Sequence, residues 1–216
     1  MIDDPTLDEL RPRLVDALLP HVPFDGWSET ALRAAAADAG IDADLARVAF
    51  TGPADMVDAY TARADAAMTA ALEAQGIGAM KVRERIRRAV QTRLEQAEPH
   101  REAVRRALAV LAMPANAPLG ARVLWRTADA MWRAAGDTAT DFNHYTKRMI
   151  LGGVYSATLL VWLDDASDGH AETWAFLDRR IEGVMRFEKV KARLSARFEN
   201  RPSMVRFLGR LRYPAV

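Results

Sequence analysis

The sequence predicts an all-α fold, and three observations support that prediction. The 216 residues are 50% hydrophobic and 27% charged, which describes an ordered chain long enough to bury one sizeable core. Apolar residues recur with the 3.6-residue period of a helix almost everywhere, whereas the Val/Ile alternation of strands is absent. Alanine, leucine, arginine and glutamate, which all favour helices or tolerate them well, dominate the composition. Disordered chains and repeat arrays are therefore excluded.

A head of small helices is predicted for residues 1–52. Its first helix carries one apolar face, made of Leu7, Leu10, Leu14 and Leu18. Proline has no backbone N–H and cannot continue a helix, so Pro20 and Pro23 are expected to end it. Ser28 is placed to cap a second helix that ends at Gly40, because a serine hydroxyl can accept an N–H of the first turn.

Longer helices are predicted to build the body of the protein, residues 53–198. After the second helix, the predicted helices occupy about residues 43–50, 53–75, 79–97, 99–113, 118–135, 139–164 and 170–197. Pro53 suits the first helical turn. Thr138 and Asp168 are placed to cap the last two helices. A basic tail, residues 199–216, follows.

Charge is distributed unevenly, although the whole chain carries a net charge of only +1. Residues 1–60 contain four basic and twelve acidic side chains, a net charge of −8, whereas residues 186–216 contain nine basic and two acidic ones, a net charge of +7. A DNA-binding protein needs basic residues to neutralise phosphates. We therefore expect the acidic head to bind no nucleic acid.

The head nevertheless has a recognisable order of residues. It runs from Gly26-Trp27-Ser28 through Ala39-Gly40-Ile41 to Phe50-Thr51-Gly52-Pro53. This run resembles the helix-turn-helix head of TetR-type transcriptional regulators, which implies a TetR-like helical bundle but does not carry the function with it. The segment in place of the recognition helix begins with Asp42 and Asp44 and has one basic residue, so the head is predicted to be degenerate. A ligand-responsive transcriptional regulator is the alternative function.

No catalytic or metal-binding pattern stands out in the sequence. The chain has no cysteine, which excludes disulfides, thiolate metal sites and cysteine nucleophiles. Its four histidines, His21, His100, His144 and His170, lack the spacing of a metal site. Phosphate-loop and nucleophile-elbow motifs are missing as well. We therefore expect a protein that is not an enzyme and that requires neither a cofactor nor a metal.

The chain is expected to stay in the cytoplasm. Its first residues, Met1-Ile2-Asp3-Asp4-Pro5, resemble neither a secretory signal nor a transit peptide. The strongly apolar, uncharged stretch 149–163 has 15 residues, whereas a membrane-spanning helix needs about 18–20. This stretch is therefore interpreted as a buried helix.

A distinctive pattern occupies residues 138–181. It consists of Thr138-Ala139-Thr140-Asp141-Phe142-Asn143-His144-Tyr145-Thr146-Lys147-Arg148, an apolar helix, Trp162-Leu163-Asp164-Asp165-Ala166-Ser167 and Thr173-Trp174-Ala175-Phe176-Leu177-Asp178-Arg179-Arg180-Ile181. The pattern resembles the ubiquinone-biosynthesis accessory lipid-binding family, that of the ninth coenzyme Q protein, whose members have a TetR-like fold. The resemblance implies a non-catalytic homodimer that binds an isoprenoid or phospholipid in an apolar cavity. It also implies presentation of quinone intermediates to a ubiquinone-biosynthesis hydroxylase at the membrane.

The apolar helix within this pattern is expected to line the lipid cavity. Its second half is hydrophobic on every face, so either protein or lipid must surround it. Glycine inside a helix costs about 1 kcal/mol relative to alanine, so Gly152-Gly153 indicates close approach of a backbone or an apolar chain. The expected lipid-binding residues are Trp125, Met131, Gly152, Tyr155, Leu159 and Trp162. The alternative is that these residues form the core of a helical bundle.

The start of the same helix is expected to contact the partner hydroxylase. The family resemblance places a surface patch there, and the expected partner-binding residues are Asp141, Asn143, His144, Tyr145 and Arg148. His144 replaces a tryptophan found in some animal members, which removes a large apolar anchor of an interface. The alternative is a helix start stabilised by Asp141 near the helix dipole and by an Asp141–Tyr145 contact.

The segment after Pro202 is expected to form an amphipathic helix that docks on the membrane. Its expected membrane-binding residues are Met204, Arg206, Phe207, Leu208, Arg210 and Leu211. Each basic side chain near an anionic surface adds about 1 kcal/mol, and the apolar face can insert among lipids. The family resemblance implies the same role, hence a peripheral position on the inner membrane. The alternative is a terminal helix that packs on its own domain or across a dimer.

Overall fold

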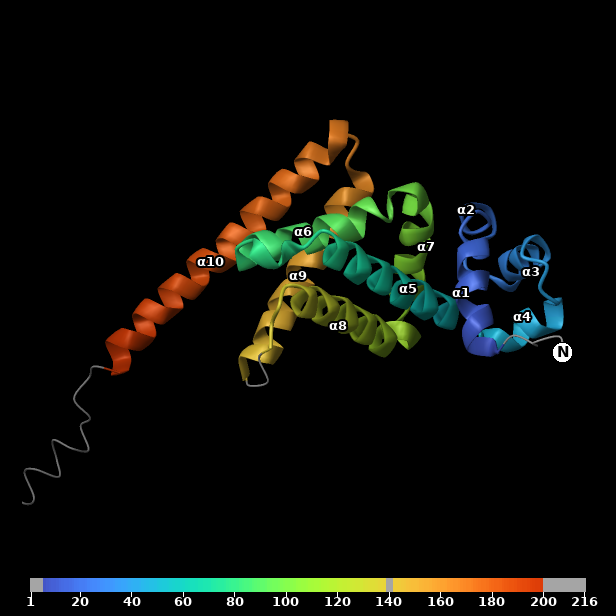
Figure 1. Ribbon diagram of the computed structural model, residues 1–216, viewed down its shortest axis with the longest axis horizontal. Coiled ribbons are helices and arrows are strands. Elements are labelled where there is room, and N and C mark those ends of the chain that lie inside the picture. Colours follow the sequence, from blue (N-terminus) through green and yellow to red (C-terminus); the bar gives the residue numbers. More distant parts are fainter. Residues whose placement is uncertain (1–5, 139–141, 200–216) are drawn as a thin grey trace, which may run out of the picture. The chain divides into compact units, whose positions relative to one another are not determined.

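The computed structural model describes residues 6–138 and 142–199, and it contains ten α-helices and no strand within those ranges (Figure 1). The all-α prediction is confirmed. The chain divides into two compact units, Met1–Leu177 and Asp178–Val216. The helices are α1 (Leu7–Leu18), α2 (Val22–Asp25), α3 (Glu29–Asp38), α4 (Ala43–Ala49), α5 (Pro53–Ala74), α6 (Val82–Glu95), α7 (Arg101–Leu111), α8 (Ala117–Ala134), α9 (Phe142–Asp164) and α10 (Ala171–Glu199).

The boundaries of the helices from α4 onward agree with the prediction to within three residues. The largest of these differences among the described residues falls at the start of α6, and helix ends are the least certain part of any assignment. The predicted cap of α9 by Thr138 would act on the N–H groups of the residues that follow it. Residues 139–141 lie outside the described residues, so this cap stays a prediction.

The head is a small three-helix cluster in which α1, α3 and α4 pack on one another (Figure 1). Leu14 and Leu18 of the apolar face of α1 are fully buried. The predicted cap of α3 is confirmed, because the Ser28 hydroxyl accepts a hydrogen bond from the Ala31 N–H at 3.2 Å. Pro20 and Pro23 both follow the end of α1 at Leu18. Pro23 also lies in the first turn of α2, a short helix that was not predicted, where its missing N–H costs nothing.

The body consists of α5 to α9, with α8 packed between α5 and α9. Met68, Leu94 and Met131 are among its fully buried side chains. Trp27 joins the head to this body, because its indole N–H donates to the Ala103 carbonyl of α7 at 3.1 Å. Its ring also lies 5.3 Å from the Tyr60 ring of α5. The head therefore packs directly on two helices of the body, α5 and α7.

The connection between α9 and α10 is organised by Asp165, and this corrects the predicted role of Asp168. One Asp165 carboxylate oxygen accepts from the Ser167 N–H and hydroxyl, and the other accepts from the Thr173 N–H and hydroxyl. Asp168 lies exposed in a 3₁₀ turn before α10. Burial alone would raise the pKa of Asp165, but hydrogen bonds from Ser167 and Thr173 hold it well below its usual range.

We expect Asp165→Asn to lower the free energy of unfolding by about 1.5–3 kcal/mol at neutral pH, because hydrogen bonds to an ionised group are lost. The folded-state pKa lies below the unfolded value, so this stability is present above about pH 4 and is lost as the pH falls further. Urea unfolding between pH 7 and pH 3 checks the sign, since the gap between wild type and variant should shrink with acid. Asp168→Asn is the matched control and should change stability by about 0.5 kcal/mol or less. An equal loss in both variants would contradict the assignment.

Candidate functional site

An apolar cavity of about 370 Å³ lies inside the body, enclosed by α5, α6, α7, α8 and α9. The residues that line it are mostly aliphatic, and α7 contributes a continuous stripe. This stripe consists of Val104, Ala107, Leu108 and Leu111. Spacings of three and four residues place these side chains on one helix face, so the cavity has a smooth apolar wall along α7.

Part of the predicted lipid-binding set lines this cavity. Tyr155 and Leu159 of α9 face it, and both are almost fully buried. A Cβ at Gly152 would lie 3.4 Å from Leu124 Cγ of α8, an ordinary van der Waals distance, and Leu124 lines the cavity. Gly153 is exposed and meets nothing within 4 Å. The close approach of a backbone or an apolar chain at this glycine pair stays a prediction.

The remaining three predicted residues, like Gly152, do not line the cavity. Met131 is fully buried in the core of the body. Trp162 is also fully buried, with its indole N–H donating to a Glu98 carboxylate oxygen at 3.1 Å and the Arg101 guanidinium 4.9 Å from its ring. Trp125 lies against aromatic side chains of α9 instead. These three side chains have packing roles, which was the alternative interpretation for the whole set.

The second half of α9 is not buried on every side, in contrast to the prediction. Met149 is 70% exposed and Leu160 is 59% exposed. Leu160 also lines the apolar cavity. The cavity therefore reaches the protein surface at Leu160. A helix that was buried on every side would not give the cavity this opening.

A buried polar cluster borders the cavity through Arg93 and Thr127. The Arg93 guanidinium lies 3.2 Å from an Asp65 carboxylate oxygen, and both side chains are 5% exposed. The Thr127 hydroxyl lies 3.0 Å from each oxygen of the same carboxylate. Burial raises the pKa of Asp65, and Arg93 and Thr127 oppose that rise. The cluster combines one buried cation with one buried anion.

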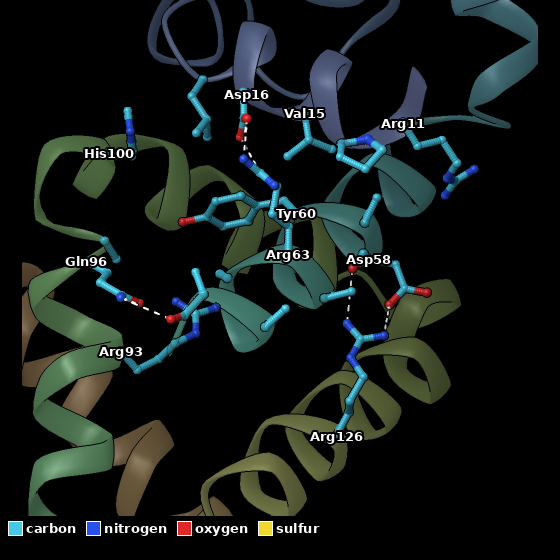
Figure 2. A pocket seen from close by; sticks show the side chains of 18 residues that line it. Arg11, Val15, Asp16, Asp58, Tyr60, Arg63, Arg93, Gln96, His100 and Arg126 are labelled. Atoms are coloured by element: carbon cyan, nitrogen blue, oxygen red, sulfur yellow. Dashed lines mark hydrogen bonds and ion pairs between the residues drawn. The ribbon is translucent and has the colours of Figure 1, made fainter. Parts of the chain in front are cut away.

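A second cavity of about 690 Å³ lies between α1, α5 and α6 and is more polar (Figure 2). Its arginines are paired with carboxylates: Arg63 binds Asp16, and Arg126 Nη1 lies 2.7 Å from Asp58 (Figure 2). Tyr60, Arg93 and Ala97 line both cavities. These residues therefore form a wall between a polar compartment and an apolar one.

The predicted partner-binding residues gather in what we term the aromatic patch, made of Trp125, His144 and Tyr145. The Trp125 ring lies 6.2 Å from the His144 ring and 5.9 Å from the Tyr145 ring. Tyr145 is 57% exposed and Asn143 is exposed beside it. Asp141 lies outside the described residues. Trp125, assigned to the lipid cavity from the sequence, is thus a member of this surface group.

Arg148 differs from the expectation of an exposed contact residue. Its side chain is 2% exposed, with Nε 2.5 Å from an Asp129 oxygen and Nη1 3.0 Å from an Asp137 oxygen. Nη1 also donates to the His144 carbonyl at 3.1 Å. Arg148 therefore positions the backbone that carries the aromatic patch and cannot itself reach a partner in this arrangement.

The exposed surface of α4 carries acidic and apolar side chains beside one arginine, Arg47. In α4, Asp42 caps the helix by accepting from the N–H groups of Asp44 and Leu45. Leu45 and Val48 are exposed on the same short helix, Val48 by 67%. The end of α4 that would enter a DNA groove therefore presents carboxylates and apolar side chains.

No group of three or more histidine, aspartate and glutamate side chains among the described residues is arranged to hold a metal ion. No single described helix is long and apolar enough to cross a membrane, and one strongly bent pair, Glu98–Leu111 with Pro114–Ala134, meets the length and composition requirement only together. All six predicted membrane-binding residues, from Met204 to Leu211, lie outside the described residues.

Comparison with solved structures establishes the fold. A TetR transcriptional regulator from Nitrosomonas europaea superposes with a TM-score of 0.65 at 21% identity, covering 80% of this chain and 96% of that one. The fatty acid degradation regulator FadR from Bacillus halodurans gives a TM-score of 0.55 at 14% identity, covering 84% and 97%. The predicted TetR-like architecture is confirmed, and identities this low show the fold alone.

Comparison with known sequences identifies the family. The profile of the COQ9 family matches residues 117–188, which contain α8, α9 and the start of α10. The mitochondrial ubiquinone biosynthesis protein COQ9 of Rattus norvegicus is 33% identical over 185 residues, which cover 82% of this chain and 59% of that protein. The human protein of the same name is 32% identical over 185 residues, covering 82% and 58%. The chain spans less than two thirds of these relatives, and it belongs to the COQ9 family.

Proposed function

We propose that this protein is a non-catalytic, lipid-binding accessory protein of ubiquinone biosynthesis. It would hold an isoprenoid or quinone lipid in the apolar cavity and present it to a membrane-associated hydroxylase. The observation that carries the proposal is the apolar cavity inside the body of a COQ9-family chain. Its volume of about 370 Å³ falls in the range of about 300–1,000 Å³ typical of small-molecule sites.

Apolar burial supplies the affinity in this proposal. Removing apolar surface from water contributes roughly 25 cal/mol per Å², so an isoprenoid segment gains most where the wall is aliphatic. The α7 stripe and Leu124 and Leu159 provide such a wall. Outside the cluster around Arg93, the polar lining residues include Thr61 and Ser156, and their hydroxyls donate to backbone carbonyls of their own helices.

The aromatic patch is the proposed contact with the hydroxylase. Exposed aromatic side chains dominate the energetics of many interfaces, and Tyr145 with Trp125 offers such an anchor. Arg148 supports the patch from beneath through the His144 carbonyl. In this proposal Asn143, His144 and Tyr145 touch the partner, while Arg148 only positions them.

The basic tail is the proposed membrane-docking element, and the division into head 1–52, body 53–198 and tail 199–216 is the corresponding proposal for domains. Residues 186–216 carry a net charge of +7, which attracts an anionic lipid surface. The chain would then work as a homodimer placed peripherally on the inner membrane.

Flotation with anionic liposomes tests the membrane-docking role of the tail. The full chain should float, and a truncation ending at Asn200 should remain in solution. Equal flotation of both would contradict the tail's role.

Filling the cavity should abolish lipid binding. Ala107 is 5% exposed and lines the cavity from α7, so Ala107→Trp places an indole where the lipid would lie. We expect co-purified lipid, measured by mass spectrometry of organic extracts, to fall by at least about tenfold, which corresponds to a loss of about 1.4 kcal/mol in binding. Thermal unfolding confirms that the variant is folded, since overpacking costs typically about 1–3 kcal/mol.

The matched control is Ala109→Trp, which adds the same side chain on the exposed face of α7 and should leave lipid content unchanged. Equal lipid in wild type and folded Ala107→Trp would contradict a role for this cavity. Salt-sensitive retention of the lipid-free protein on DNA would favour a transcriptional regulator instead, because counterion release makes such binding fall steeply with salt.

A further inference from the structure

The connection between α7 and α8 is an exposed corner without charged side chains. From residue 107 to residue 121 every side chain is uncharged, and Asn116 is the only polar one. The helical segments that meet there, Glu98–Leu111 and Pro114–Ala134, are bent by 91°. Met113 is 56% exposed, and the other exposed residues are Ala109, Ala112, Pro114, Ala115, Ala117, Pro118 and Ala121. We term residues 107–121 the apolar corner, and an exposed apolar patch is typical of a surface that contacts a partner or a membrane.

Several polar groups of the apolar corner are hydrogen-bonded within it. The Asn116 side-chain amide donates to the Val110 carbonyl at 2.8 Å. The backbone N–H groups of Met113 and Asn116 donate to carbonyls of the corner at 3.3 and 2.8 Å, and Pro114 and Pro118 have no N–H. Lipid offers no hydrogen-bond partners, so a segment whose polar groups are satisfied internally enters it at lower cost. This internal bonding favours a lipid environment for the corner.

Arginines flank the apolar corner on both sides. The nearest charged residues are Arg105 and Arg106 before it and Arg122 after it. Residues 101–135 contain six basic and two acidic side chains, a net charge of +4. Arg122 is 67% exposed, and the Asp58 carboxylate that it pairs with is shared with a second arginine. Each basic side chain near an anionic lipid surface adds about 1 kcal/mol, so the charge around the corner complements such a surface.

We infer that the apolar corner is a second membrane-contact surface, which inserts its exposed apolar side chains into an anionic bilayer while the flanking arginines bind lipid phosphates. This inference rests on the membrane docking proposed for the tail and adds a contact on the body itself. Stable anchoring takes two signals, and the corner supplies the second one. Leu111, Ala112 and Gly120 of the corner also line the apolar cavity, so this contact brings residues of the cavity wall to the bilayer.

Fluorescence of a label at position 113 tests the contact in the full chain. The chain has no cysteine, so Met113→Cys can be labelled selectively with nitrobenzoxadiazole. Val48→Cys on α4 is the matched control, because Val48 is also apolar and is 67% exposed. With vesicles of phosphatidylcholine and phosphatidylglycerol, we expect the emission of the label at position 113 to shift to shorter wavelength. Lipids that carry a nitroxide on the acyl chain should quench it, and the label at position 48 should show neither change.

A charge placed in the corner measures its contribution to binding. Met113→Asp should lower the partition coefficient of the full chain on the same vesicles about five- to tenfold. The reason is that an exposed apolar side chain is replaced by an anion that the lipid surface repels. Val48→Asp should leave the partition coefficient unchanged. Thermal unfolding confirms that both variants are folded, as expected for exposed positions.

The outcomes separate this inference from the proposed function. If the vesicle-bound chain kept the label at position 113 in water, or if Met113→Asp bound as tightly as wild type, the contact at the apolar corner would be overturned. The docking role of the tail would stand in either case. Failure of wild type to bind the vesicles at all would overturn the membrane docking proposed for the tail, and the second contact with it.

Discussion

Replacement of Arg148 by alanine is expected to lower the free energy of unfolding by about 3–5 kcal/mol, the cost of breaking a buried ion pair by removing one partner. Arg148 is 2% exposed and pairs with Asp129 and Asp137, of which Asp137 is itself 6% exposed. Without the guanidinium, these carboxylates keep Arg133 and Lys147 as their cationic partners among the residues that the structure describes. Urea unfolding of the variant measures the loss.

Arg133→Ala is the matched control, because Arg133 pairs with the same Asp129 but is 72% exposed. Exposed ion pairs contribute about 0–1 kcal/mol, so this variant should remain close to wild type. Arg148→Ala should also loosen the aromatic patch, seen as a changed tryptophan emission that Arg133→Ala lacks. If the two variants lost equal stability, Arg148 would not have the positioning role assigned to it.

Replacement of Arg93 by methionine should be comparably destabilising, by about 3–5 kcal/mol, because it leaves the Asp65 carboxylate buried without its principal cation. Asp65 would retain the Thr127 hydroxyl and a longer contact of 3.6 Å to Arg126. Adding Asp65→Leu to Arg93→Met should cost less than the sum of the two single changes, since each single change already leaves one charge unpaired.

The control for this pair is Arg63→Met, which removes a cation from the exposed Arg63–Asp16 pair of the polar cavity. It should cost about 0–1 kcal/mol in urea unfolding. Strictly additive losses in the Arg93–Asp65 cycle would show that the two charges do not interact, which would contradict the buried ion pair described beside the apolar cavity.

The order and extent of the helices could be predicted from the sequence because each rests on local physics. Apolar periodicity, the Ser28 cap and the stops at proline and glycine depend on neighbours within one or two turns. The predicted Asp168 cap was wrong because local sequence alone did not distinguish between several possible caps. Asp165, Ser167 and Asp168 are all plausible caps by residue type, and only the folded turn determines which carboxylate reaches the Thr173 N–H.

The site was harder to predict because it depends on contacts between distant segments. Tyr155 and Leu159 were found because α9 is strongly apolar, whereas the α7 stripe was missed although its spacing was visible in the sequence. Nothing local could have shown that Trp162 meets Glu98 or that Arg148 meets Asp129. An arginine in a polar sequence context was expected at the surface, and two carboxylates brought together by α8 and its following turn made its burial possible.

The central claim is that the cavity enclosed by α5 to α9 holds a lipid, and native mass spectrometry of the full chain tests it most directly. Wild-type protein purified from a ubiquinone-producing host should retain a non-covalent adduct with the mass of a prenylated quinone intermediate or another isoprenoid lipid. The same adduct should be missing from folded Ala107→Trp and present in Ala109→Trp. A wild-type spectrum that contains only the unliganded mass, or an adduct that persists in Ala107→Trp, would contradict the claim.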